Sequence, residues 1–144
     1  MFMVVVSGFF IVVFGALSAL HVYWALGGQA GLDKAVPYID GKPAFEPGAV
    51  LTALVAVVLL GCAVIALTLG FADPFAMPYA HLAPNVGWTL AAVFALRAIG
   101  DFKLVGFFKK IKDSRFATFD SKLYSPLCVM LSAGFMFLSL APNV

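Results

Sequence analysis

Residues 47–72 read PGAVLTALVAVVLLGCAVIALTLGFA, a run of 26 residues that contains no Asp, Glu, Lys or Arg. Its only hydroxyl groups belong to Thr52 and Thr68. An α-helix rises about 1.5 Å per residue, so about 20 residues cross the roughly 30 Å of hydrocarbon in a bilayer. This stretch therefore predicts a transmembrane helix over about residues 48–70.

Three further runs lack charge in the same way, and they cover residues 1–32, 74–96 and 123–144. Each is long enough to cross a bilayer. Only 11% of the 144 residues are charged, against about 25% in average soluble proteins, and the mean hydropathy is +1.05. The sequence predicts an all-α, four-helix transmembrane bundle that forms a single domain of residues 1–144. The spans are expected at about 4–24, 48–70, 84–104 and 124–140.

The basic residues all fall on one side of this bundle. Two spans separate loop 1 (residues 26–47) from loop 3 (residues 105–123), so both loops lie at the same membrane face. Loop 2 (residues 71–83) and both chain ends contain no Lys or Arg, whereas loops 1 and 3 and the turns leading into loop 3 hold all nine. Because basic loops stay in the cytoplasm, we expect loops 1 and 3 to be cytoplasmic and both termini to be outside. The expected location is the bacterial cytoplasmic (inner) membrane, as a multi-pass protein.

Several classes of protein are excluded by the distribution of residues. The basic residues flank the spans instead of forming a soluble basic face, so nucleic acid is not an expected partner. No phosphate-binding loop and no HExxH motif occurs in the sequence. Cys62 and Cys128 are expected at depths of roughly 21 and 6 Å, too far apart for a disulfide. His21 and His81 are expected at opposite membrane faces, about 30 Å apart, so we expect no metal site and no cofactor.

Ionisable residues inside a span are the most informative ones, because a charge near the centre of a bilayer costs on the order of 3 kcal/mol or more. Arg97 and Asp101 lie four residues apart in the third predicted span, so they share one helix face and are expected to pair. Arg97 is about 10 Å from the end of that span. Such a pair either binds a ligand or only neutralises both charges and fixes the rotation of the helix.

Other polar residues gather at the same cytoplasmic end of all four spans. Loop 1 is longer than the roughly 12–15 residues of ordinary connections, which is typical of lids and binding elements. We therefore expect a ligand site beneath loop 1, with Arg97 as the anion anchor and His21 as its proton-active neighbour. The alternative is that these residues only anchor the bundle at the membrane interface. The candidate site residues are His21, Tyr23, Trp24, Glu46, Arg97, Asp101, Asp120, Tyr124 and Ser125.

Two further patterns concern packing and the membrane surface. Gly87, Ala91 and Ala95 recur every four residues, a small-residue stripe that predicts close helix packing. Packing within the bundle is favoured over a seam between two copies. In loop 3, Phe108, Ile111 and Phe119 line one face if the loop is helical, with Lys109, Lys110 and Lys112 elsewhere, which predicts a segment that lies on anionic lipid.

Five short strings carry a family resemblance: HVYWALGG at 21–28, RAIGDF at 97–102, GFF at 106–108, FATFD at 116–120 and YSPLC at 124–128. Together they resemble a family of small bacterial four-span membrane proteins that is catalogued as a domain of unknown function. The resemblance covers nearly the whole chain. It implies a four-helix inner-membrane protein, and it implies no activity.

Three functions follow as hypotheses. The first is a membrane-embedded binding or catalytic protein whose cytoplasmic-end site takes a small anionic molecule or a lipid headgroup. The second is a small transporter or channel that works as a homo-oligomer, although the second and fourth spans hold no acidic residue to carry coupling protons. The third is an accessory subunit of a larger membrane complex. The expected partners are the lipid bilayer, a lipid or small anion, and a second copy of the chain, and the sequence assigns no reaction.

Overall fold

The computed structural model describes residues 1–71 and 78–140. Residues 72–77 of the predicted second loop, which include Asp73 and Pro74, lie outside the described residues. The described chain holds four helical segments that are long and apolar enough to cross a membrane. They are α1 (Phe2–Ala25), α3 (Ala49–Phe71), the short 3₁₀ turn η1 (Ala80–Leu82) with α4 (Ala83–Ile99), and a fourth segment made of α5 (Arg115–Phe119), η2 (Asp120–Tyr124) and α6 (Ser125–Leu140). The predicted all-α, four-span bundle is confirmed.

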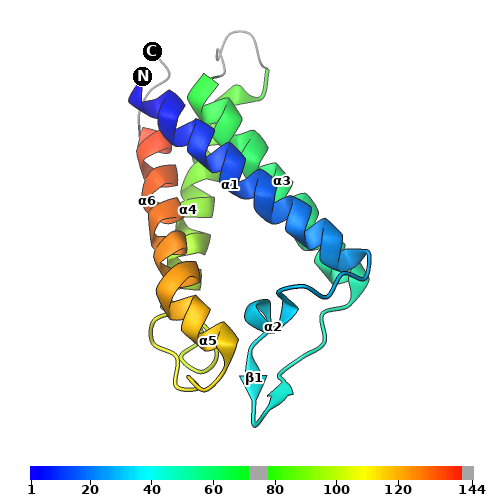
Figure 1. Ribbon diagram of the computed structural model, residues 1–144. Coiled ribbons are helices and arrows are strands. Elements are labelled where there is room, and N and C mark those ends of the chain that lie inside the picture. Colours follow the sequence, from blue (N-terminus) through cyan, green and yellow to red (C-terminus); the bar gives the residue numbers. More distant parts are fainter. Residues whose placement is uncertain (72–77, 141–144) are drawn as a thin grey trace.

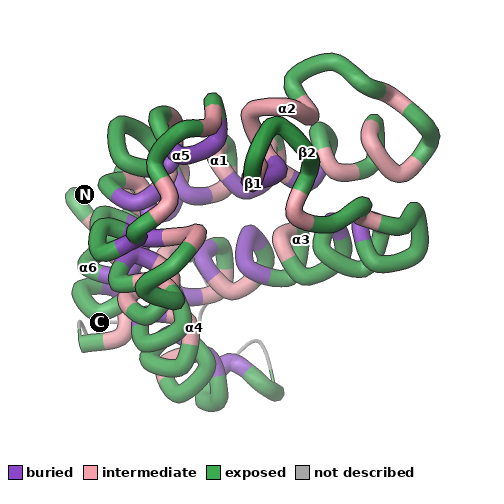
Figure 2. The backbone as a smooth tube through the Cα atoms, turned by 90° about the horizontal axis from the view of Figure 1, so that it is seen from below, coloured by how far each residue is buried: buried purple, intermediate pink, exposed green. Residues whose placement is uncertain are grey.

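The four segments form two helix pairs that meet at one end only. Helix α1 packs along α3, and α4 packs along α6. The pairs lie together where α1 begins and α6 ends, and they diverge toward the opposite end (Figure 1). That opposite end carries residues 26–48 and residues 100–114, and we call it the loop end (Figure 1). Seen from the loop end, buried residues lie on the sides of the helices that face one another, and exposed residues lie on the outer sides (Figure 2).

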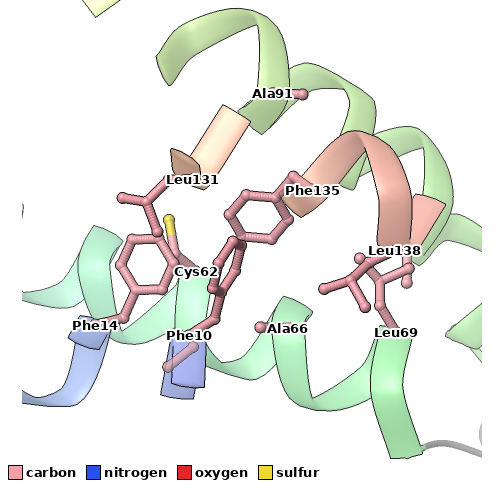
Figure 3. Packing of buried hydrophobic residues seen from close by; sticks show 11 residues of the cluster. Phe10, Phe14, Cys62, Ala66, Leu69, Ala91, Leu131, Phe135 and Leu138 are labelled. Carbon is pink, nitrogen blue, oxygen red and sulfur yellow. The ribbon is translucent and has the colours of Figure 1, made fainter. Parts of the chain in front are cut away.

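Aromatic rings join the two pairs. Phe10 and Phe14 of α1 are 2% and 0% exposed, and both lie against Phe135 of α6, with ring centroids 5.1 and 5.8 Å apart (Figure 3). Phe94 of α4 stacks on Phe135 with a centroid distance of 6.1 Å. Stacked and edge-to-face aromatic pairs add about 0.5–1.5 kcal/mol beyond the area that they bury. These ring contacts therefore hold the two helix pairs together near the middle of the bundle and toward the end where α1 begins and α6 ends.

Serine hydroxyls supply the polar contacts between helices inside the bundle. Ser7 and Ser18 of α1 donate to the carbonyls of Ala66 and Ala56 of α3, the second over 2.8 Å. Ser132 of α6 donates to the carbonyl of Ala91 of α4 over 2.7 Å. Lipid gives no hydrophobic force between helices, so close packing and such hydrogen bonds carry the association.

The small-residue stripe of α4 faces α6, as expected for packing within the bundle. A Cβ atom added to Gly87 would collide with the side chain of Ser139 on α6. Ala91 is 3% exposed. The predicted use of this stripe inside one chain is confirmed at these two positions.

The helix ends at the loop end differ from the prediction. Helix α4 stops at Ile99 and not near residue 104, because Gly100 takes a φ of +86° that helices do not contain. The fourth segment begins at Arg115, about nine residues before its predicted start. Loop 1 contains a single helical turn, α2 (Leu32–Ala35), and a two-stranded hairpin of β1 (Tyr38–Ile39) and β2 (Lys42–Pro43), in which Tyr38 lies opposite Pro43.

Candidate functional site

A buried carboxylate lies at the centre of the polar residues of the loop end. Asp120, in η2, has no exposed surface. Its Oδ1 atom accepts a hydrogen bond of 2.9 Å from Nη2 of Arg97 on α4. Its Oδ2 atom accepts bonds of 3.0 Å from Nζ of Lys109 and 2.7 Å from the backbone N–H of Gly106. One carboxylate thus joins α4, the fourth segment and the segment between them.

The two cations of this cluster differ in how completely they are used. The Lys109 side chain is 1% exposed, and its ammonium also donates to the Gly106 carbonyl (2.9 Å) and to Ser121 Oγ (2.6 Å). An ammonium has three donors, so all of them are bonded. Arg97 is 33% exposed, and its Nη1 atom is buried with no hydrogen-bond partner among the described residues. Arg97 therefore keeps free donor capacity.

The charges of the cluster do not cancel. Arg97 and Lys109 bring two positive charges to the single negative charge of Asp120, and no other carboxylate of the described residues pairs with either cation. A buried charge without compensation is costly, and the cost falls when an anion comes close. The cluster has the electrostatic character of an anion site.

A π-helical turn sets the position of Asp120. The N–H of Ser125 donates to the carbonyl of Asp120, five residues earlier, in place of the four-residue step of an α-helix. Pro126 follows and has no N–H to donate. Such π turns occur often at functional sites. Ser125 is fully buried, and its Oγ atom has no hydrogen-bond partner among the described residues.

The predicted pairing of Arg97 with Asp101 is wrong. The i,i+4 argument needs a continuous helix, and α4 ends at Ile99. Asp101 is exposed, and its Oδ1 atom accepts hydrogen bonds from the backbone N–H groups of Leu104, Lys103 and Val105 at 2.8–3.1 Å. These bonds lower the pKa of Asp101 below its ordinary value. Asp101 stabilises the turn after α4 instead of orienting Arg97.

Loop 1 is tied to the fourth segment by polar contacts. Asp33 of α2 forms an ion pair of 2.6 Å with Arg115 of α5. The hydrogen bond from Arg115 lowers the pKa of Asp33. Tyr124 donates its hydroxyl to the Lys34 carbonyl (2.8 Å), and Lys34 Nζ lies 5.2 Å from the ring centre of Phe119. Loop 1 thus connects the two diverging helix pairs at the loop end.

The remaining predicted residues lie with loop 1 on the α1–α3 pair. Nδ1 of His21 lies 2.7 Å from the Leu17 carbonyl, and the His21 ring lies edge-on to Trp24 at 5.1 Å. Tyr23 accepts a bond from the Ala30 N–H (3.3 Å), and its ring lies against Gly28. Glu46 is exposed in the segment before α3.

The predicted residues therefore form two groups. Arg97, Asp120 and Ser125 lie in or beside the buried cluster. His21 and Trp24 line a separate pocket between α1, α2 and α3, and Arg97 is not among the residues that line it.

Lys109 and Gly106 are site residues that the sequence reasoning missed. Lys109 was expected on the polar face of a loop 3 helix, but residues 100–114 contain no helix and its ammonium is buried. One of three neighbouring lysines in a basic loop carries no signal that it will be buried. Gly106, with a φ of +86°, offered only the general signal that glycine permits unusual backbone angles.

Comparison with known proteins supports the family resemblance. No curated protein and no solved structure matches the chain. A family model described as "Protein of unknown function (DUF3995)" matches residues 14–135, which include α3, α4 and both loops at the loop end completely, together with the second half of α1 and the fourth segment as far as Phe135. The chain therefore belongs to the DUF3995 family of proteins of unknown function.

Proposed function

We propose that this membrane protein binds a small anionic molecule or a lipid headgroup at its loop end, with Arg97 as the charge anchor. The observation that carries the proposal is the free Nη1 atom of Arg97, which is buried and has no hydrogen-bond partner among the described residues. Guanidinium groups bind phosphates and carboxylates through two parallel N–H bonds. Nη2 of Arg97 donates to Asp120, and Nη1 is the donor that we assign to the ligand.

The charge of the cluster supports the same ligand. With Arg97 and Lys109 facing Asp120, the group carries one surplus positive charge. An anion beside Arg97 would balance that charge. Partial exposure of Arg97, at 33%, leaves room for approach from outside the cluster.

The expected membrane orientation supplies a source for this ligand. All nine Lys and Arg residues belong to the segments at or leading to the loop end. A cytoplasmic location of this end, in the bacterial inner membrane, places Arg97 near anionic lipid headgroups and cytoplasmic anions.

The test is a thermal-shift titration of the detergent-solubilised protein. The probes are inorganic phosphate and a short-chain phosphatidylglycerol, with the matching phosphatidylcholine as the zwitterionic control. A ligand at 100 times its Kd stabilises the folded state by about 2.7 kcal/mol, so an anion that binds raises the unfolding midpoint. Phosphate and phosphatidylglycerol distinguish a free anion from a lipid headgroup.

Variants then locate the site. Arg97→Gln removes the charge and should abolish the shift, whereas Arg115→Gln, an exposed arginine at the same end, should retain it. Arg97→Lys keeps the positive charge that pairs with Asp120 but loses the second terminal nitrogen of the guanidinium. This variant replaces Arg97→Gln in the test if the glutamine variant does not fold. An unchanged shift in both Arg97 variants would refute the proposal.

A further inference from the structure

A pocket of about 300 Å³ lies at the loop end between α1, α2 and α3, apart from the Arg97 cluster. Of its ten lining residues, only His21, Trp24 and Thr52 carry a polar side-chain atom. The others are Leu32, Ala35, Val36, Phe45, Pro47, Leu51 and Val55. An apolar pocket with very few polar groups is the usual form of a small-molecule site.

Two of these three side chains already use their hydrogen-bond donors. Trp24 donates its ring N–H to the Ala30 carbonyl over 2.9 Å. Thr52 donates its hydroxyl to the Gly48 carbonyl over 2.9 Å. No side-chain donor among these two residues is therefore left for a ligand. Thr52 keeps acceptor capacity but is only 8% exposed, so His21, which is partly exposed, is the more accessible acceptor.

The hydrogen bond of His21 determines which ring nitrogen is free. Nδ1 lies 2.7 Å from the Leu17 carbonyl, and a carbonyl only accepts, so we assign the ring proton to Nδ1. In the neutral ring, Nε2 is then an unprotonated acceptor. No second hydrogen bond of this ring occurs within the described residues. The pocket thus offers the ring nitrogen Nε2 as an acceptor on an apolar wall.

We propose that this pocket binds a neutral amphiphile that donates one hydroxyl hydrogen bond to Nε2 of His21 and places its apolar body against Trp24, Ala35 and Val55. An anion is disfavoured because a neutral Nε2 repels it and no free donor lines the pocket. A cation is disfavoured because the walls give it no counter-charge. At roughly 30 Å³ per water-sized group, the volume suits a body on the order of ten non-hydrogen atoms.

This proposal does not depend on the anion site. None of the residues that line the pocket belongs to the Arg97 cluster, so loss of one site does not predict loss of the other. Aliphatic alcohols and alkyl-substituted quinols share the required chemistry of a hydroxyl on an apolar body. A molecule of either kind dissolves in the bilayer and reaches the α1–α3 pair from the lipid.

Trp24 itself reports on occupancy. The chain has two tryptophans, and the other, Trp88, is 41% exposed on α4. In a Trp88→Phe background, fluorescence comes from the pocket alone. The probe is decanol with bromine on its far carbon, which quenches tryptophan on contact, and its matched control is the methyl ether of the same molecule. We expect the alcohol to quench at about tenfold lower concentration than the ether, as loss of one hydrogen bond predicts.

Substitutions test the role of His21. His21→Leu should remove the difference between alcohol and ether, whereas His21→Gln, which places an amide oxygen in the region of Nε2, should keep part of it. Val55→Phe should fill the pocket and weaken quenching by both probes, and Val58→Phe, 58% exposed on the same helix and not a lining residue, should not.

The outcomes decide the proposal. Equal quenching by alcohol and ether in the protein that retains His21, or an undiminished difference in His21→Leu, overturns it. Should His21→Leu fail to fold, the comparison of Val55→Phe with Val58→Phe decides, and equal quenching in those two variants overturns the proposal. A butyl-substituted quinol, used as a competitor, distinguishes the two kinds of ligand. If the quinol displaces bromodecanol, a ring-bearing ligand is favoured. If only unbrominated decanol displaces it, an aliphatic alcohol is favoured.

Discussion

Arg97 and Asp120 lie 23 positions apart in the chain and are joined by a 2.9 Å ion pair whose carboxylate has no exposed surface. The pair connects the last turn of α4 to the π turn that lies between α5 and α6 in the fourth segment. Lys109 completes it from the intervening segment. The loop end thus depends on one acidic side chain for the position of three parts of the chain.

Replacing that side chain should be costly. Asp120→Asn keeps the shape but leaves Arg97 and Lys109 without their counter-charge, and removing one partner of a buried ion pair costs about 3–5 kcal/mol. Unfolding in mixed detergent micelles measures this change. Asp113→Asn, at an exposed position of the same region, is the control and should change the stability by less than about 0.5 kcal/mol. Similar values for the two variants would show that the cluster does not stabilise the fold.

A glycine of the site is expected to resist substitution for two separate reasons. Gly106 has a φ of +86°, and an added Cβ would collide with the Ile99 carbonyl oxygen. Gly106→Ala should therefore destabilise by more than backbone strain alone, which costs of order 1–3 kcal/mol. Gly41→Ala is the matched control, because Gly41 has a φ of +74° and open space around it. A difference near zero between the two would contradict the close approach of Gly106 to Ile99.

The hydrogen bond between Ser132 and the Ala91 carbonyl allows a test inside the membrane. Ser132→Ala removes the 2.7 Å bond between α6 and α4, and such bonds are worth about 0.6 kcal/mol on average. Ser139→Ala is the comparison, since Ser139 Oγ is buried on the same helix and has no hydrogen-bond partner in the described part of the chain. We expect destabilisation by the first change and a neutral or stabilising effect of the second, measured by the same unfolding assay. The reverse order would contradict the assignment.

The contact between loop 1 and α5 should weaken in acid. Asp33 has a pKa below its ordinary value of 3.8 because Arg115 stabilises the carboxylate. The stabilisation is fully present above pH 3.8 and is lost as the pH falls through the lowered value. Hydrogen-exchange protection factors of α2, which correct for the intrinsic pH dependence, should fall in that range. In Arg115→Gln this acid-dependent change should disappear, and its persistence would show that another group is responsible.

The sequence was sufficient to predict the spans, because only long stretches without charged residues are stable in the hydrocarbon of a bilayer. The predicted spans 48–70 and 4–24 agree with α3 and α1 to within two residues at each end. The site was predicted only in part. Arg97, Asp120 and Ser125 were identified because polar residues at the end of a span are costly and few.

The pairing within the site required tertiary information. An i,i+4 spacing favoured Asp101 as the partner of Arg97, but Gly100 ends the helix between them. Asp120 replaces it because the fourth segment begins about nine residues earlier than the charge-free run suggested. Burial of Lys109 follows from that folded arrangement, and nothing local distinguishes it from Lys110.

The phenylalanines labelled in Figure 3 join the two helix pairs. At the loop end, the two helix pairs are bridged by the ion pair of Asp33 with Arg115 and by the hydrogen bond of the Tyr124 hydroxyl to the Lys34 carbonyl. Water can replace both of these polar contacts. Water cannot replace the ring contacts in the same way. We therefore expect any separation of the two helix pairs to begin at the basic loop end, while the contacts of Phe10, Phe14 and Phe135 persist.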